Sequence, residues 1–132
     1  MRLALATCSN VPSWEADDRP FHAALAARDV EVTHAVWDDP KVDWAHFDAV
    51  LIRTTWDYQE KRDAFVAWAE RVPVPLFNPA AIVRWNTHKS YLRELESRGV
   101  PIIPTEWLAT GTRPDVAALC RARGWTRAFL KP

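Results

Sequence analysis

The chain has 132 residues, 48% of them hydrophobic and 26% charged, and its 17 basic and 17 acidic residues give a formal net charge of zero. This length and composition are typical of a folded globular protein and exclude intrinsic disorder. The balanced charge and scattered basic residues argue against nucleic acid as a partner, because proteins that bind nucleic acid carry a basic surplus.

The first predicted elements alternate between strands and helices. Apolar and β-branched runs predict strands at residues 2–6, 31–37, 49–53 and 74–77. A helix is expected to open at Asp17, Asp18 and Pro20, because acids favour the positive end of a helix and proline fits its first turn. A longer amphipathic helix is predicted over residues 57–72, and residues 38–48 are expected to contain only a turn or two of helix.

The second part of the chain predicts three more helices. One follows Asn78 and Pro79, and a second begins near a capping Thr87 and ends at Gly99. A third opens at a capping pair of Thr112 and Asp115 and ends at Gly124. A brief extended strand is expected at residues 101–105 and a final strand at residues 127–131. The alternating order predicts an α/β fold with a mostly parallel, Rossmann-like sheet, and a second unit is expected to begin at residue 79.

Metal, membrane and secretory features are not expected. The two cysteines, Cys8 and Cys120, are far apart, and the four histidines lie on separate segments, so no metal site is predicted. No apolar run is long enough to cross a bilayer, and the apolar run at the start of the chain is too short for a signal peptide. We therefore expect a cytoplasmic protein without a membrane partner.

Polar residues directly follow the predicted strands, where open α/β sheets bind ligands. The richest segment runs from Arg53 to Tyr58: Arg53 can hold a carboxylate and Asp57 can pair with an amine. The residues predicted to contact a small substrate are Cys8, Ser9, Arg53, Thr55, Trp56, Asp57 and Tyr58. The alternative is structural, with Thr55 and Asp57 capping the next helix and Trp56 packing beneath it.

Common nucleotide-binding and nucleophile motifs are absent. The sequence has neither the glycine pattern of dinucleotide-binding folds nor a P-loop, and it contains only three glycines. No serine nucleophile motif is present, and Cys8 has no histidine partner nearby in the sequence.

Several segments together resemble those of ATP-grasp ligases. They read FNPAAIVRWNTHKSYL at residues 77–92, GVPIIPT at 99–105 and AFLKP at 128–132, preceded by WDDP at 37–40 and RTTWDY at 53–58. The two upstream motifs are similar to those of the subgroup related to glutathione synthetases, RimK-type ligases and cycloserine-forming ligases. The resemblance spans nearly the whole chain, and it rests on three motifs in the expected order.

The resemblance implies a pre-ATP-grasp substrate-binding domain at residues 1–78 and the beginning of an ATP-grasp domain at 79–132. It implies ATP and Mg²⁺ as cofactors of a complete enzyme, an amino-acid-like substrate, and an acyl phosphate that an amine attacks. Lys89 and Lys131 match the lysines that contact ATP phosphates, although His88 stands where the family commonly has Asp. The glycine-rich loop and magnesium ligands lie outside these 132 residues, so no ligase activity is expected from this chain alone.

Two other functions stay open at this point. The chain can be a standalone, non-catalytic α/β binding or interaction domain that keeps the fold without the chemistry. A flavodoxin-like domain is less favoured, because no acidic pair directly follows the first strand. A homodimer or a tendency to aggregate is expected if the last predicted strand lacks its neighbours in a larger sheet.

Overall fold

The computed structural model describes residues 1–11 and 18–131, and the chain divides into two compact units, Met1–His88 and Lys89–Pro132. Asp17 and Pro132, which belong to two of the motifs above, lie outside the described residues. The first unit, Met1–His88, is the larger of the two.

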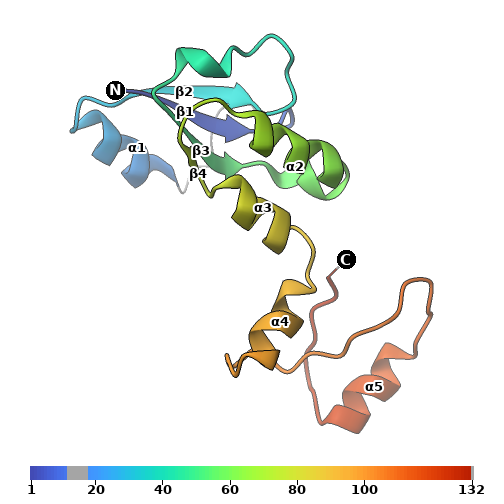
Figure 1. Ribbon diagram of the computed structural model, residues 1–132. Coiled ribbons are helices and arrows are strands. Elements are labelled where there is room, and N and C mark those ends of the chain that lie inside the picture. The colour runs from blue at the N-terminus through green and yellow to red at the C-terminus, as the bar shows by residue number, and fades with distance from the viewer. Residues whose placement is uncertain (12–17, 132) are drawn as a thin grey trace. The chain divides into compact units, whose positions relative to one another are not determined.

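The first unit contains a four-stranded parallel sheet (Figure 1). Its order is β2-β1-β3-β4, and its strands are β1 (Arg2–Thr7), β2 (Glu31–Val36), β3 (Ala49–Thr54) and β4 (Leu76–Phe77). All three strand pairs are parallel. The predicted α/β class with a mostly parallel, Rossmann-like sheet is confirmed, and each of the four strands lies where its sequence pattern placed it.

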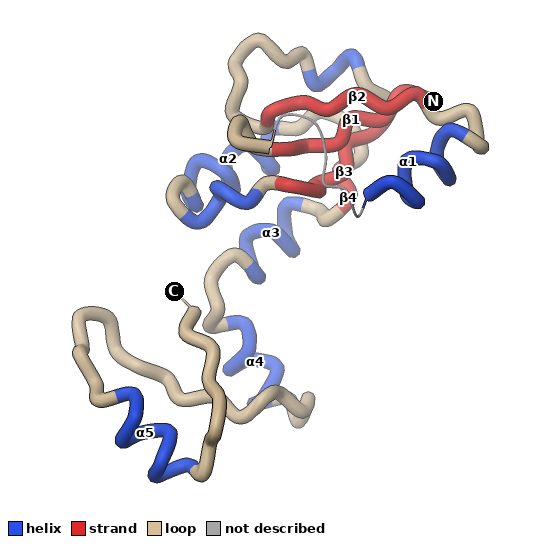
Figure 2. The backbone as a smooth tube through the Cα atoms, turned by 180° about the vertical axis from the view of Figure 1, so that it is seen from behind, coloured by secondary structure: helices blue, strands red, loops and turns tan. Residues whose placement is uncertain are grey.

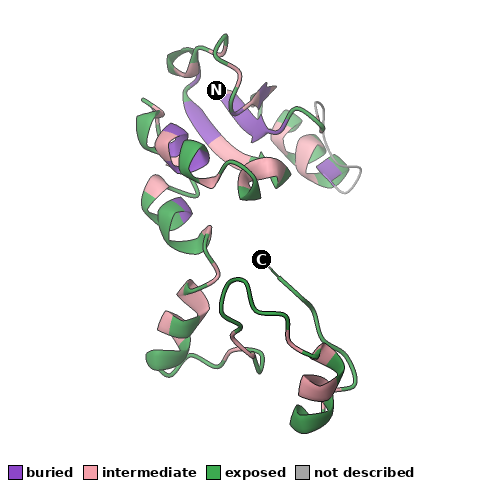
Figure 3. Cartoon of the chain, turned by 90° about the vertical axis from the view of Figure 1, so that its right-hand side faces the viewer, coloured by how far each residue is buried: buried purple, intermediate pink, exposed green. Residues whose placement is uncertain are grey.

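Helices cover both faces of this sheet. Leu3 and Leu5 of β1 point to the face covered by α1 (Arg19–Ala26), where Phe21 and Leu25 pack on them. Ala4 and Ala6 point to the opposite face, which is covered by α2 (Arg62–Arg71). Successive side chains of a strand alternate between faces, so the apolar residues 3–6 of β1 are buried on both sides of the sheet, whose buried parts Figure 3 colours purple.

An aromatic cluster forms the core beneath α2. Trp37 and Trp68 are 2% and 5% exposed, and both pack against Phe65, at ring-centre distances of 5.1 and 5.3 Å. Trp44 of the short 3-10 helix η2 (Trp44–His46) stands edge-on to Trp68 at 5.2 Å. Burial of such large rings supplies much of the hydrophobic stabilisation of a small unit.

The long helix predicted over residues 57–72 consists of two helices. A 3-10 helix, η3 (Trp56–Gln59), comes first, and α2 starts only at Arg62. The first unit ends with α3 (Ala80–Asn86), which contacts α2; Arg62 donates hydrogen bonds to the Thr87 hydroxyl at 3.1 Å and to the Arg84 carbonyl at 3.2 Å. The predicted domain boundary at residue 78 therefore precedes a helix that packs within the first unit.

The described residues of the second unit form two helices and loops (Figure 2). These are α4 (Tyr91–Ser97) and α5 (Val116–Arg123). Asp115 caps α5 by accepting the Ala118 N–H at 2.9 Å, and Gly124 ends it with a φ of 68°, a conformation that glycine adopts readily.

Four local predictions for this region were wrong. Residues 101–105 and 127–131 form no strand, because a strand is stable only when it is paired and the described part of this unit contains no strand beside them. Thr87 does not cap α4, which begins after Ser90. The Thr112 hydroxyl donates to the Ala109 carbonyl at 2.7 Å, so Asp115 caps α5 without it. Among the described residues, no helix is long and apolar enough to span a membrane.

Candidate functional site: the carboxyl ends of β1 and β3

The strand order places a topological switch point, called the crevice below, at the carboxyl ends of β1 and β3. From β1 the chain passes to α1 and then to β2 at one side of the sheet, whereas from β3 it passes to α2 and β4 at the other side. Ligands of open α/β sheets bind where neighbouring strands lead away in opposite directions, because the loops part there. This position is occupied by Thr7–Asn10 and by Arg53–Tyr58.

Hydrogen bonds join the ends of these two strands. The Thr54 hydroxyl donates to the Thr7 hydroxyl at 2.8 Å, and the Cys8 N–H donates to the Thr54 carbonyl at 3.1 Å. Both threonines are buried, at 0% and 4% exposure. The Thr7 hydroxyl in turn donates to the Val11 carbonyl at 2.5 Å, which holds the first residues of the loop against the sheet.

The predicted substrate residues Cys8 and Ser9 lie in different surroundings. The Cys8 thiol is fully buried, and its single S–H can donate to the Thr54 carbonyl at 3.0 Å or to Asn10 Oδ1 at 2.7 Å. Its geometry therefore matches a small core residue with satisfied hydrogen bonds. Ser9 follows in a turn and is exposed to solvent.

Three predicted residues at the end of β3 differ in how accessible they are. Arg53 is exposed, Thr55 is buried at 6% exposure, and Trp56 projects into solvent at 57% exposure. Thr55 stands at the start of η3 but makes no side-chain capping bond. The capping alternative is therefore wrong for Thr55, and Trp56 does not pack beneath the helix.

Asp57 links the ends of two strands to α2. It accepts a hydrogen bond from the Trp37 indole N–H at 2.8 Å, and Lys61 Nζ lies 3.4 Å from its other oxygen. Lys61 also donates to Asp38 at 2.7 Å, and both carboxylates raise the pKa of Lys61, with Asp38 contributing most. Tyr58 packs on Phe65 at a ring distance of 5.6 Å. The side chains of Asp57 and Tyr58 therefore already contact other residues of the first unit.

The sequence missed Asp18 as a residue of this site. Asp18 precedes α1, is 2% exposed, and accepts hydrogen bonds from Arg53 Nε at 3.1 Å and from Arg53 Nη2. This contact raises the pKa of Arg53. The only sequence signal for Asp18 was an acid placed before a helix, which predicts a helix start as readily as a partner for an arginine.

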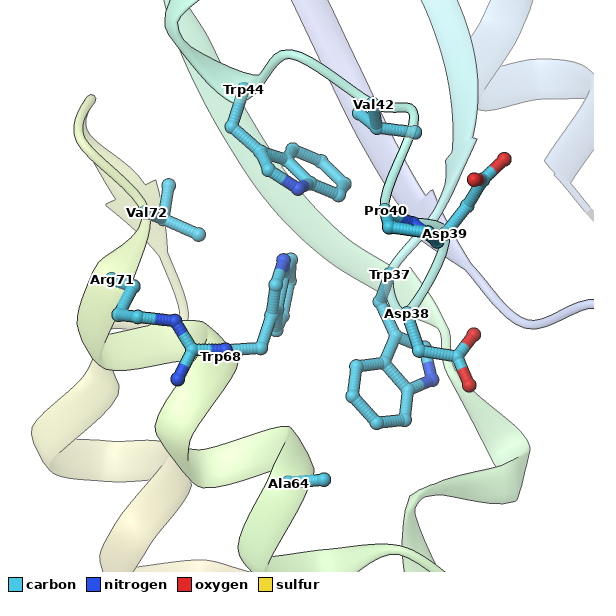
Figure 4. Close-up of a pocket in the computed structure, with 10 residues that line it drawn as sticks. All are labelled: Trp37, Asp38, Asp39, Pro40, Val42, Trp44, Ala64, Trp68, Arg71 and Val72. Atoms are coloured by element: carbon cyan, nitrogen blue, oxygen red, sulfur yellow. The ribbon is translucent and has the colours of Figure 1, made fainter.

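A cavity of about 360 Å³ lies at the carboxyl end of β2, beside this crevice within the same unit. Figure 4 shows the indoles of Trp37, Trp44 and Trp68 around it, with Arg71 on the α2 side and Asp38 and Asp39 on the loop side, their carboxylates turned outward. Its walls are thus mainly aromatic, and the charged groups of Asp38, Asp39 and Arg71 lie at its rim.

The two lysines predicted to bind ATP belong to the second unit. Lys89 precedes α4 and is half-buried, whereas Lys131 lies in the extended tail and is exposed. They are therefore parts of one compact unit, separate from the unit that carries Arg53. No cluster of histidine, cysteine and acidic side chains suited to a metal ion occurs in the described part of either unit.

A first prediction concerns the bond between Asp57 and Trp37. Asp57→Ala removes the acceptor of a buried indole N–H and should lower the free energy of unfolding by about 1–3 kcal/mol, the cost of an unsatisfied buried donor. Urea denaturation measures this change. Asp38→Ala is the matched control, since it removes a carboxylate from the same Lys61 but leaves the indole bond intact, and it should cost at most about 1 kcal/mol. Equal losses in the two variants would show that the indole bond contributes nothing.

A second prediction concerns pH. His34 stacks on His22 at 5.1 Å, and burial, followed by the charge of His22, lowers the pKa of His34, while Asp18 acts in the opposite direction. Because the unfolded chain takes up the proton near pH 6.5 and the folded chain only at lower pH, the free energy of unfolding should fall as the pH drops below about 6.5.

His34→Gln should reduce this loss when urea midpoints are compared at pH 7.5 and pH 5.5. His46→Gln, which changes an exposed histidine beside Arg2, should leave the loss as in the parent. If the His34 variant lost as much stability between pH 7.5 and pH 5.5 as the parent, the pH dependence would arise from other groups.

Comparisons with known proteins agree with this fold. Residues 3–78 match the family model of the N-terminal domain of D-cycloserine synthetase DcsG. The cycloserine biosynthesis protein DcsG of Streptomyces lavendulae is 42% identical over 113 residues, which are 80% of this chain and 37% of that protein. The crystal structure of D-cycloserine synthetase DcsG superimposes with a TM-score of 0.71 at 33% identity, over 94% of this chain and 43% of that one.

The present chain thus spans less than half the length of both relatives. The family match covers β1 to β4 and includes the crevice with Arg53 and Asp57. The chain belongs to the family of DcsG N-terminal domains, which are parts of a biosynthetic enzyme.

Proposed function

We propose that this chain is the N-terminal, substrate-binding part of an ATP-dependent carboxylate–amine ligase of the ATP-grasp type. The observation that carries the proposal is the similarity to D-cycloserine synthetase DcsG, which extends beyond the family model to 94% of the chain. The resemblance of residues 77–92, 99–105 and 128–132 to ATP-grasp segments supports the same assignment.

In the proposed enzyme, the crevice between β1 and β3 receives a small amino-acid-like substrate. Arg53 is the exposed cation there and suits a carboxylate, because a guanidinium can donate two parallel hydrogen bonds to it. Trp56, three residues later in the sequence, offers an exposed aromatic surface. Asp57, Tyr58 and Cys8 act in this account by fixing the walls of the crevice, since their polar or aromatic groups already contact neighbouring residues.

The proposed role of the second unit is to contact the nucleotide. Lys89 and Lys131 would donate to ATP phosphates, where ammonium groups offset negative charge as a phosphoryl group moves to a carboxylate. Magnesium would assist by neutralising the same charge, held by residues outside this chain. An amine would then attack the acyl phosphate. We propose that the 132-residue chain by itself has no ligase activity and that the protein acts in the cytoplasm.

The extended segment that ends in Lys131 is consistent with this role. Phe129 and Leu130 are 92% and 73% exposed. Apolar side chains exposed to this degree favour a partner surface, either further chain in the full enzyme or a second copy in a homodimer.

The nucleotide part of the proposal is tested with Lys131→Ala. The variant should bind ATP at least about tenfold more weakly than the parent, since charge-assisted hydrogen bonds to a phosphate are lost. Isothermal titration with ATP and magnesium measures the affinity. Lys41→Ala, which removes an exposed lysine of the first unit, is the control and should bind as the parent does. Unchanged affinity in the Lys131 variant would remove this residue from the nucleotide site.

A further inference from the structure

Two residues contact the Arg53 guanidinium: Asp18 accepts hydrogen bonds from its N–H groups, and the ring of Phe21 lies against its planar face. Its Nε and Nη2 donate to Asp18 Oδ1, with an Nε–oxygen distance of 3.1 Å. Its Cζ lies 5.7 Å from the centre of the Phe21 ring, within the range of a cation–π contact. Asp18 and Phe21 both come from the start of α1, on the opposite side of the crevice from the helix that follows β3.

Asp18 is an unusual partner for an arginine that is itself half-exposed. The Asp18 side chain is 2% exposed, and that of Arg53 is 47% exposed. The second oxygen of Asp18, Oδ2, is buried and has no hydrogen-bond partner among the described residues. A carboxylate buried with so few partners is costly, and an ion pair of this kind is weak evidence for stability. Asp18 accepts hydrogen bonds from Arg53, and its charge also acts on His34, whose pKa it raises against the opposing effects of burial and His22.

The pair of Arg2 and Asp48 provides a contrast within the same sheet. Their side chains are 42% and 45% exposed, so both partners are solvated, as in ordinary surface ion pairs. That pair lies at the amino ends of β1 and β3, away from the crevice. A buried acid opposite an exposed guanidinium therefore occurs at the end of the sheet where a ligand would bind.

The contacts of Arg53 leave one end of its guanidinium available. Asp18 engages Nε and Nη2, and Nη1 has no partner among the described residues. A mobile arginine side chain loses conformational entropy when it binds a ligand. A side chain that is already fixed in the folded protein does not lose this entropy on binding. The fixed Arg53 thus offers its Nη end to a carboxylate in a preset orientation.

We propose that Asp18 and Phe21 are positioning residues, which orient the Arg53 guanidinium for the carboxylate of the substrate. That the carboxylate belongs to an amino-acid-like substrate rests on the proposed function; the fixed guanidinium and its affinity for a carboxylate do not depend on ATP. Asp18 and Phe21 belong to the loop and helix after β1, and Arg53 belongs to β3, so the assembly spans the two strands whose ends form the crevice.

Nuclear magnetic resonance of the whole chain tests this proposal through the Nε–H signal of Arg53. Propionate supplies a carboxylate alone and ethylammonium an ammonium alone. In the parent, the Nε–H signal should be sharp, and propionate should shift it while ethylammonium should not. In Asp18→Asn, the signal should move and broaden, and propionate should bind roughly tenfold more weakly, because a charge-assisted hydrogen bond that fixes the arginine is weakened.

Asp48→Asn is the matched control, since it removes the carboxylate from the other Arg–Asp pair of the sheet, and it should change neither the Arg53 signal nor the affinity for propionate. The backbone amide spectrum of each variant shows whether it is folded. If Asp18→Asn does not fold, Phe21→Leu, which keeps the ion pair and removes the ring, should give the same change to a smaller degree.

Two results would overturn the proposal. One is an Arg53 signal and a propionate affinity that are the same in the folded Asp18 or Phe21 variant as in the parent. The other is a parent chain in which propionate leaves the Arg53 signal unmoved. Neither result depends on nucleotide, so a failure here is distinct from a failure of Lys131→Ala to weaken ATP binding.

Discussion

The hydrogen bonds that join the ends of β1 and β3 are the constraint on which the candidate site depends. β1 and β3 are parallel neighbours with a register irregularity between Ala6 and Thr7, and the bonds from Thr54 to Thr7 and from Cys8 to Thr54 extend their pairing beyond it. Because these bonds are buried, the loops start from fixed points. Arg53, one residue before Thr54, projects on the opposite side of the strand and faces α1.

A second set of interactions fixes the neighbouring strand. The Trp37 indole binds Asp57, and Lys61 joins Asp57 to Asp38, so the end of β2 is tied to η3 and the start of α2. The same indole packs on Phe65 and Trp68 in the core. Loss of any of these contacts would therefore alter both the stability of the unit and the shape of its ligand-facing edge.

Much of the first unit could be predicted from the sequence, because its strands are apolar runs bounded by turn residues and buried by local helices. The second unit was harder, since residues 101–105 and 127–131 have strand-like composition but no strand beside them in the described structure. Strand propensity is a weak guide without a pairing partner. The helix stop at Gly124 was predicted correctly, because a positive φ depends on the local chain alone.

The site itself was only partly predictable. Residue type and position after β3 identified Arg53, but the partner of Arg53 is 35 residues earlier in the chain, and no local pattern marks Asp18 as that partner. For the same reason the sequence did not distinguish Asp57, whose carboxylate binds Trp37, from a residue open to a substrate. Long-range hydrogen bonds decide which polar side chains are used within the fold and which remain available.

The central claim is that the crevice is built on a rigid edge, and amide hydrogen exchange tests it most directly. The Cys8 N–H donates to the Thr54 carbonyl at 3.1 Å and the Trp37 N–H to the Thr7 carbonyl at 2.9 Å. Both amides should exchange as slowly as that of Leu5 in the middle of β1, and the exposed turn residue Ser9 should exchange much faster. Exchange at Cys8 as fast as at Ser9 would show that the ends of β1 and β3 open freely, and would contradict the account.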